Sequence, residues 1–529
     1  MVTDLDTSAQ PLRVLEEAMR RRTFAVISHP DAGKSTLTEA MALHAHVVDE
    51  AGVTHGKASR AVSLSDWGEV ERERGISITS TTVRFNYRDA VLNLADTPGH
   101  SDFSEDTYRV LTAVDFAVML IDAAKGMEAQ TRKLFDACRR LALPVVTVIN
   151  KWDRPGLEAL ELFDEIQAAT GRTPVPVNWP VGYAGRFAGL LEPGSSRYVR
   201  HEVVDSGAHV AREEIVDGAT DQRLDPGLWL EAVEGAGVAA ELNGTFDAGQ
   251  FLAGKQTPVL FTAAAGNVGV RILLDFLTVH APAPTQRSDT SGAPRSLGSE
   301  FSGYVFKIQA GMNPSHRDQI AFVRVNSGVF TRGMDLHHAQ TGRPVSSKYA
   351  HHLVGRGRHT ATASWPGDVV GFVNTTGLHV GDTIHAGAPV TFPGMPRFDP
   401  ERFRVVRNLD AARQKRFTKG LTQLEEEGAI QVLRDANGSP GGPILAAVGD
   451  LQFEVAVERM RREFGVDVAL EPPLDYERSR PLPRTGVGQV APLPGVEILY
   501  RPDGEPVALF HDRWRLARTQ EKFPDLFPA

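Results

Sequence analysis

Short apolar runs alternate with longer amphipathic stretches over the first half of the chain. The runs have the length of strands, and the stretches between them repeat their apolar positions with a helical period. This alternation predicts a mostly parallel sheet with crossover helices. The expected strands are residues 23–28, 91–95, 116–121, 145–149 and 259–261.

The pattern changes twice in the second half of the chain. Residues 281–303 are rich in Pro, Ser, Thr and Gly, which is typical of a linker. Short alternating segments with glycine turns then favour a β-barrel up to residue 393. From residue 401, the order strand, helix, strand, strand, helix, strand predicts a ferredoxin-like α+β module. We therefore expect a multidomain α/β protein with domains at residues 1–285, 299–395 and 400–529.

Two parts of this plan are less regular. A long gap separates Asp153 from Ala263, so we expect an inserted subdomain at about residues 155–256. The Trp-Pro-Val-Gly sequence at 179–182 and a strand-like segment at 198–204 suggest it. After Pro472 the chain mixes proline-rich turns with apolar pieces. The pattern leaves the structure of this C-terminal tail open.

Composition narrows the class of protein. The 529 residues carry 57 Lys and Arg against 66 Asp and Glu, a net charge of −9, which excludes a generally basic surface for nonspecific nucleic-acid binding. The one cysteine, Cys138, excludes an intramolecular disulfide and fits a reducing compartment. No apolar run approaches the length of a membrane span. We expect a cytoplasmic protein with no membrane and no DNA partner.

A candidate phosphate-binding loop follows the first predicted strand. Its residues are Ser28, His29, Pro30, Asp31, Ala32, Gly33, Lys34, Ser35 and Thr36, with Ser28 in the position of the first glycine of the motif. In such a loop the backbone N–H groups converge on phosphate oxygens, Lys34 reaches the β and γ phosphates, and Ser35 places its hydroxyl on Mg²⁺. The alternative is an ordinary strand-turn-helix in which Gly33 permits a tight turn.

A second candidate motif is Asp96, Thr97, Pro98, Gly99 and His100, after the strand at residues 91–95. An Asp in this position holds a metal through water, and Gly99 leaves its N–H free for a γ-phosphate. The alternative is a β-turn, because Asp-Thr-Pro-Gly is favourable turn sequence.

Two further motifs are suited to a purine base. Asn150, Lys151, Trp152 and Asp153 follow the strand at residues 145–149, and a carboxylate there accepts the donor pair that guanine has and adenine lacks. Ala263, Ala264 and Ala265 follow the strand at 259–261 and offer a backbone N–H to the base carbonyl. A helix-capping loop and a small-residue turn are the alternatives. All these motifs stand at the carboxyl ends of predicted parallel strands, where open α/β sheets bind ligands.

A nucleotide-sensitive switch is predicted at residues 74–78, which read Arg-Gly-Ile-Ser-Ile. The hydroxyl of Ser77 closes on Mg²⁺ while a γ-phosphate is present, if this segment is a switch. A surface serine at a strand edge is the alternative.

With these motifs in this order, the chain resembles the translational GTPases, the family that contains elongation factor G. The likeness rests on residues 28–36, 74–78, 96–109 and 150–153, and it continues into the later domains at 303–310 and 447–453. It implies a P-loop GTPase domain, then a translation-factor β-barrel, then the ferredoxin-like domain. It further implies GTP or GDP and Mg²⁺ as cofactors, with Ser35, Ser77 and Asp96 as metal ligands. Ala263 departs from the family pattern, which commonly has Ser or Thr there.

The resemblance also implies a mechanism and partners. His100 orients the attacking water and Lys34 stabilises charge on the phosphates, once the ribosome has ordered the site. Within the family the likeness is nearest to a termination factor that removes codon-reading (class I) release factors after peptide release, and that is a monomer off the ribosome. The alternatives are a ribosome-rescue or ribosome-protection GTPase and, in a different class, a nonhydrolysing nucleotide-binding scaffold.

Two local patches reconcile a net negative charge with an RNA-containing partner. Residues 336–367 contain no Asp or Glu but have four basic residues and five histidines, and residues 401–420 have seven basic residues against two acidic ones. Both are candidate phosphate-contacting surfaces. Ordinary solvated faces are the alternative for each.

Overall fold

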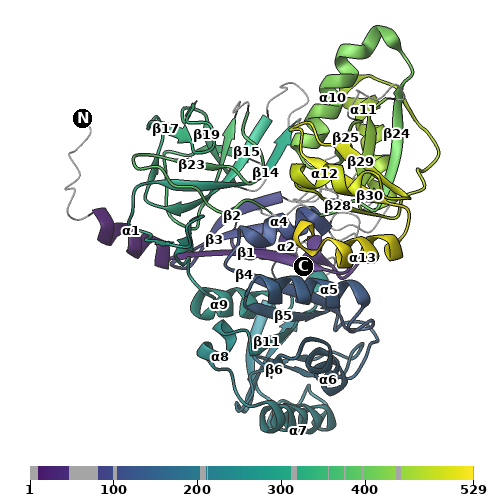
Figure 1. The fold of residues 1–529 in the computed structure, drawn as a ribbon. Coiled ribbons are helices and arrows are strands. Elements are labelled where there is room, and N and C mark those ends of the chain that lie inside the picture. Colours follow the sequence, from purple (N-terminus) through teal and green to yellow (C-terminus); the bar gives the residue numbers. More distant parts are fainter. Residues whose placement is uncertain are drawn as a thin grey trace.

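The computed structural model of the chain describes residues 10–46, 81–98, 104–202, 210, 212–310, 319–354, 357–373, 377–395, 398–435 and 442–527. Figure 1 shows an α/β part in the centre and lower half, a β-rich part at the upper left and a second α/β part at the upper right. Among the described helices, none has both the length and the apolar character that crossing a membrane needs.

A seven-stranded sheet forms the centre of the first part, in the order β2-β3-β1-β4-β5-β11-β6. All the predicted strands are present in it and pair in parallel. The edge strand β2 was not predicted and runs antiparallel to β3. The strands are β1 (Arg21–Ser28), β2 (Thr81–Tyr87), β3 (Ala90–Asp96), β4 (Phe116–Asp122), β5 (Val145–Asn150), β6 (Thr173–Pro176) and β11 (Gln256–Phe261).

Helices cover both faces of this sheet. One hydrophobic cluster joins the sheet to α4, α5 and α6, and a second joins its other face to α2 and α9. Strands β3, β4 and β5 are buried at every position, as expected for runs that are apolar on both faces. The helices are α1 (Gln10–Met19), α2 (Lys34–His44), α4 (Ser104–Thr112), α5 (Ala129–Arg140), α6 (Ala159–Thr170) and α9 (Val270–His280).

The inserted subdomain is smaller than the sequence suggested. Strand β6 pairs in parallel with β11 and so belongs to the main sheet. A separate four-stranded sheet, in the order β10-β9-β8-β7, begins only at Trp179 rather than near residue 155. Its strands are β7 (Trp179–Val181), β8 (Gly189–Leu191), β9 (Arg197–Glu202) and β10 (Arg212–Asp217), and α7 (Pro226–Asn243) packs with them. Helix α8 (Ala248–Leu252) follows, and its Phe251 packs in the cluster of the main sheet with α2 and α9.

The β-rich part has an eight-stranded sheet in the order β18-β17-β23-β14-β15-β22-β19-β20, with its own apolar core. A short hairpin, β12 with β13, stands in the stretch predicted as a linker. The strands are β12 (Arg287–Ser288), β13 (Pro294–Arg295), β14 (Ser302–Ala310), β15 (Gln319–Ser327), β16 (Phe330–Thr331), β17 (Leu336–His338), β18 (Pro344–Val345), β19 (Ala350–Val354), β20 (Gly357–Thr360), β21 (Ala363–Ser364), β22 (Val369–Val373) and β23 (Thr383–His385).

The third part has the predicted ferredoxin-like order, and its strands pair as β25-β26-β24-β27. Both helices pack in one apolar cluster with the sheet. The elements are β24 (Arg402–Asn408), α10 (Gln414–Glu426), β25 (Gln431–Leu433), β26 (Ile444–Ala447), α11 (Asp450–Phe464) and β27 (Val468–Leu470).

The tail, which the sequence left open, is a folded layer of this third part. It forms a three-stranded sheet in the order β28-β30-β29. Its residues Leu499, Val507 and Leu509 share an apolar cluster with Phe403 and Leu433 of the ferredoxin-like sheet. Because a sheet with helices on one face leaves the other face open, the tail supplies the missing cover. Its elements are β28 (Arg478–Pro481), α12 (Val487–Val490), β29 (Val496–Tyr500), β30 (Pro506–Phe510) and α13 (Arg513–Lys522). The domain boundaries given above stay predictions.

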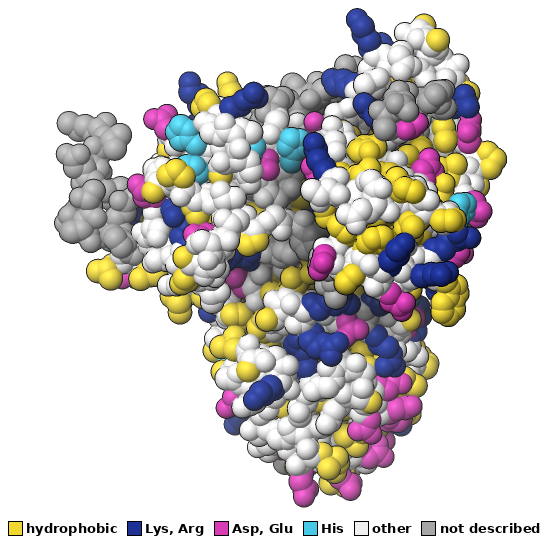
Figure 2. Space-filling view, in the orientation of Figure 1, with side chains coloured by type: hydrophobic (Ala, Val, Ile, Leu, Met, Phe, Trp, Pro, Cys, Tyr) yellow, Lys and Arg dark blue, Asp and Glu magenta, His cyan; other side chains and the backbone are white. Residues whose placement is uncertain are grey.

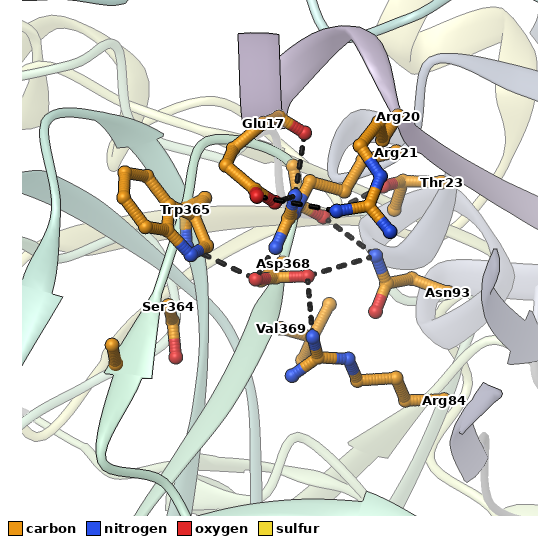
Figure 3. A network of polar contacts seen from close by, with 12 residues as sticks. Glu17, Arg20, Arg21, Thr23, Arg84, Asn93, Ser364, Trp365, Asp368 and Val369 are labelled. Carbon is orange, nitrogen blue, oxygen red and sulfur yellow. Dashed lines mark hydrogen bonds and ion pairs between the residues drawn. The ribbon is translucent and has the colours of Figure 1, made fainter. Parts of the chain in front are cut away.

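A turn of the β-rich part, residues 365–368, presses against the first three strands of the central sheet (Figure 3). The carboxylate of Asp368 is fully buried, 3.2 Å from Arg21 Nε and 3.8 Å from an Arg84 nitrogen. Asn93 Nδ2 lies 3.4 Å from the same carboxylate. Burial raises the pKa of Asp368, but Arg84 and Arg21 outweigh it, and the net pKa is below its usual range. This cluster is called the Asp368 cluster below.

Candidate nucleotide-binding site

The loop after β1 has the backbone that a phosphate-binding loop needs. Gly33 has φ 96° and precedes α2, and Asp31 has φ 65°. A Cβ on Gly33 would lie 2.6 Å from Asn150 Nδ2, so both its conformation and its surroundings require glycine. The first turn of α2, with Lys34 and Ser35, therefore directs its backbone N–H groups toward the carboxyl edge of the sheet.

Lys34 and Asp96 lie together at this edge. Asp96 is opposite Val26 in the β1–β3 register, which places both motifs at neighbouring strand ends. The Lys34 ammonium contacts an Asp96 carboxylate oxygen, and both side chains are buried. Thr97 donates its hydroxyl hydrogen to the Val26 carbonyl at 2.9 Å and fixes the start of the second motif. Residues of the predicted phosphate and metal chemistry are thus adjacent.

Asn150 joins the other two motifs. Its Nδ2 donates to the Ala32 carbonyl at 3.0 Å, and its Oδ1 accepts from the Thr262 hydroxyl and from the Ala264 N–H, each at 3.0 Å. The side chain is almost fully buried. One amide therefore connects the phosphate loop after β1 with the loop after β11, although these lie far apart in the sequence.

Thr262 was missed by the sequence reasoning. The sequence predicted a backbone N–H donor at residues 263–265, where the family commonly has Ser or Thr at 263. The structure has a hydroxyl one residue earlier, on Thr262, and this hydroxyl bonds Asn150. Ala263 instead pairs with Val268 in a β-bridge, and Ala265 is exposed. The signal in the sequence was Thr262 itself, directly after an apolar strand.

Lys151 shows a second missed residue, Asp122. Lys151 Nζ lies 2.8 Å from Asp122 Oδ2 and also contacts the Asp31 carbonyl. Asp122 ends β4 and accepts from the Ala124 N–H at 2.9 Å. It follows an apolar strand as Asp96 does, so the same reasoning applied to β4 would have found it. Lys151 has φ 66°, which turns the chain so that its side chain crosses the phosphate loop.

Trp152 and Asp153 point in opposite directions. The Trp152 side chain is buried, its Nε1 donates to the Gly182 carbonyl at 3.2 Å, and its ring meets Phe261 edge-on at 4.8 Å. Its side chain therefore belongs to the core that joins β5 and β11 to the insert. Asp153 is exposed and remains available to an external donor pair.

The remaining predicted residues are only partly described. Ser28 donates to the His29 carbonyl at 2.8 Å, and His29 Nε2 lies 3.2 Å from Glu128 Oε1. Pro30 and Thr36 are half-buried beside them. Gly99, His100, Ser77 and the switch at 74–78 lie outside the described residues.

Several histidines and arginines of the two basic patches already have partners within the protein, so fewer of them can contact phosphate than the composition suggests. Figure 2 shows histidines gathered on the β-rich part at the upper left. Two of them are buried with partners: His338 lies 2.9 Å from Asp382, and His352 contacts the Val369 carbonyl. In the second patch, most of the arginines face acidic groups, as in the pairs of Arg407 with Glu471 and Arg413 with Asp410. Arg356 lies outside the described residues.

Comparisons with known proteins match three consecutive parts of the chain. The Elongation factor Tu GTP binding domain family matches residues 19–283, Elongation factor G domain 2 matches 300–387, and Class II release factor RF3, C-terminal domain matches 392–520. Peptide chain release factor 3 from Gloeobacter violaceus is 46% identical over 460 residues, 86% of this chain and 86% of that protein. The chain belongs to the peptide chain release factor 3 family.

Other members of the peptide chain release factor 3 family match almost end to end. The protein from Microcystis aeruginosa is 41% identical over 535 residues, 99% of this chain and 97% of that protein. The one from Synechococcus elongatus is 42% identical over 536 residues, 99% of this chain and 94% of that protein. A crystal structure of a protein from Thermus thermophilus shares the fold, with a TM-score of 0.70 at 22% identity over 87% of this chain and 68% of that one.

Membership of the release factor 3 family makes the chain a translational GTPase release factor that binds GTP or GDP. The family resemblance and the predicted fold class are confirmed.

Proposed function

We propose that the chain is a ribosome-stimulated GTPase that promotes dissociation of codon-reading class I release factors after peptide release. The observation that carries this proposal is the coincidence of a C-terminal region matching the class II release factor domain with a site in which Asn150 joins the phosphate loop to the base loop. The C-terminal match supports a role in translation termination, and the Asn150 site supports a guanine nucleotide as the switch of the protein.

Mg²⁺ fits the donors at the phosphate edge. Ser35 offers a hydroxyl in the first turn of α2, and Asp96 offers a carboxylate at the end of the neighbouring strand. Hard oxygen donors of this kind are the ligands that Mg²⁺ prefers. We assign the metal to Ser35 and Asp96, with Ser77 added from the switch. The metal would neutralise charge on the β and γ phosphates.

The catalytic assignments follow the same edge. Lys34 is buried beside Asp96, which supports assigning its ammonium to the charge that develops on the phosphates. His100 follows Pro98 by two residues and is assigned to orient the attacking water. Asp153, exposed in the loop after β5, is assigned to the guanine N1–H and amine. The predicted phosphate-loop residues 28–36 line the phosphates.

The decisive assay uses post-release ribosomes that carry a fluorescently labelled class I release factor. With GTP, the protein should accelerate dissociation of that factor, and His100→Ala should bind GDP normally but lose ribosome-stimulated turnover. No acceleration would refute the termination role. Stimulated turnover together with clearance of stalled ribosomes would instead favour the rescue alternative.

The proposed partners are ribosomal RNA and ribosomal proteins as well as the class I factor, met by a cytoplasmic monomer without membrane or DNA contacts. Because the arginines of the second patch face acidic groups, the first patch is the better candidate for RNA. Charge reversal of Arg356 and Arg358 should weaken ribosome binding and reduce its salt dependence. An unchanged salt slope would remove this patch from the interface.

A further inference from the structure

The C-terminal end of α4 and the residues after it bond to two arginines from outside the central sheet, Arg324, which is buried, and Arg287, which is half-buried. Arg324, on strand β15 of the β-rich part, donates to the Ala113 carbonyl at 2.6 Å and to both oxygens of Asp115 at 2.7 and 2.8 Å. Arg287, on strand β12, donates to the carbonyls of Thr112 and Val114. The last carbonyls of a helix lack partners within the helix and carry partial negative charge, which a guanidinium group can satisfy. Of the bonded carbonyls, that of Thr112 is the last of α4, and those of Ala113 and Val114 follow the helix end.

Burying a guanidinium group costs free energy, so these two arginines are expected only where acceptors surround them. Arg324 is 1% exposed. Burial and the neighbouring Arg324 lower the pKa of Arg287 to about 10, while Asp115 acts in the opposite direction. Asp115 accepts through both carboxylate oxygens from one nitrogen of Arg324, a contact strengthened by the opposite charges of the two groups. Arg287 and Arg324 can both lie near the one carboxylate of Asp115, because the backbone carbonyls at the end of α4 and just after it accept their other hydrogen bonds.

The other end of α4 is tied to the nucleotide site. Thr107 donates its hydroxyl hydrogen to the Pro98 carbonyl at 3.3 Å, in the loop that begins with Asp96. Thr97 in that loop bonds to β1. Helix α4 also packs against strand β14 of the β-rich part, which lies next to it in Figure 1. A rigid helix of this length therefore links the β-rich part to the loop that holds Asp96.

We propose that Arg324 is a positioning residue for GTP hydrolysis, which fixes the C-terminal end of α4 and thereby sets the position of the 96–98 loop. It acts through the helix and touches neither the nucleotide nor the reacting atoms. The inference rests on the GTPase activity of the family. On this proposal, hydrolysis depends on how the β-rich part is seated.

The Asp368 cluster supplies a matched control. It is a second buried ion pair between the same two parts of the protein, but it contacts β1, β2 and β3 and not α4 (Figure 3). Asp368→Asn weakens the seating of the β-rich part as Arg324→Met does. Only the Arg324 change releases the end of α4.

The test measures GDP affinity, the affinity ratio of a nonhydrolysable GTP analogue to GDP, and kcat and KM for GTP with and without ribosomes. For Arg324→Met we expect kcat to fall about 10- to 100-fold, as for a misplaced catalytic loop, and the affinity ratio to fall with it. GDP affinity should stay unchanged. Arg324→Lys should restore part of kcat, and Asp368→Asn should leave kcat unchanged.

Two outcomes would overturn the inference: an unchanged kcat in Arg324→Met, or an equal loss of kcat in Arg324→Met and Asp368→Asn. If Arg324→Met unfolds because Asp115 is left unpaired, the double variant with Asp115→Asn decides between the same outcomes. A wild-type protein that ribosomes do not stimulate would refute the proposed function. The turnover without ribosomes and the affinity ratio would still test the role of Arg324.

Discussion

Removing the Asn150 side chain should separate the two loops that it joins in the proposed nucleotide site. Asn150→Ala deletes one donor bond to the Ala32 carbonyl and two acceptor bonds, from the Thr262 hydroxyl and the Ala264 N–H. The three bonds are 3.0 Å long and the site is buried, so water does not readily replace them. The phosphate loop and the base loop then lose their common support.

The expected loss of GDP affinity follows from these three hydrogen bonds. A net loss of about 1 kcal/mol for each bond gives about 3 kcal/mol, which is about a 100-fold loss of GDP affinity if the bound state bears the whole cost. Asn150→Asp keeps both acceptor bonds and loses only the donor bond, so it should fall between wild type and Asn150→Ala. The assay is a fluorescence titration with a GDP analogue, accompanied by thermal unfolding.

Asn178 provides the control for general destabilisation. It is equally buried, donates to the Phe261 carbonyl at 3.2 Å and accepts from the Phe261 N–H at 2.7 Å, but it does not contact the phosphate loop. Asn178→Ala should lower the unfolding temperature and leave GDP affinity close to wild type. If both alanine variants lose GDP affinity equally, Asn150 is a core residue and its bridging role is wrong.

Three other outcomes are expected. Gly33→Ala should weaken GDP binding, because the φ of 96° is strained for alanine and the new Cβ would lie 2.6 Å from Asn150 Nδ2. The control Gly171→Ala, at φ 69° in open space, should leave the GDP affinity measured by titration unchanged. Equal losses of GDP affinity in the two variants would contradict the assignment of the site. Since the pKa of Asp368 is lowered, its stabilisation is complete above its ordinary value of 3.8 and is lost as pH falls below it. The difference in urea midpoint between wild type and Asp368→Asn should therefore shrink from about pH 7 to about pH 3, and a constant difference would refute the assignment. Burial raises the pKa of Cys138 to about 12, so a thiol-exchange reagent should label it only after unfolding; labelling of the folded protein would show otherwise.

The sequence was informative wherever a pattern is local. Apolar runs located the strands, and the residues after them located the loops, because the carboxyl ends of parallel strands share one edge. The sequence does not show which side chains from different strands bond to one another. Nothing in the spacing of Asn150 says that its amide bonds Ala32, and nothing in the spacing of Asp122 says that its partner is Lys151.

The tail and the insert show a second limit. Residues after Pro472 have no strong period of their own, because their apolar side chains are shared with the ferredoxin-like sheet and the partner face supplies the pattern. Strand β6 joins the main sheet through β11, which follows it only after the whole insert. From the sequence alone such a strand is assigned to the insert, because its partner strand β11 comes only after the insert has ended.

The contacts between the parts of the protein fall on the elements that carry the nucleotide loops. Strand β1 has Arg21 of the Asp368 cluster at its start and the phosphate loop after its end, and α4 has Arg324 at its end and the 96–98 loop before its start. A change in the seating of the β-rich part through β1 acts on a strand hydrogen-bonded on both sides, which resists displacement. A change through α4 acts on a short helix that reaches the loop directly. Asn93 of the Asp368 cluster lies on β3, which ends at Asp96, so both routes lead to this carboxylate. We expect the route through α4 to transmit movement of the β-rich part more readily, because it does not pass through the sheet.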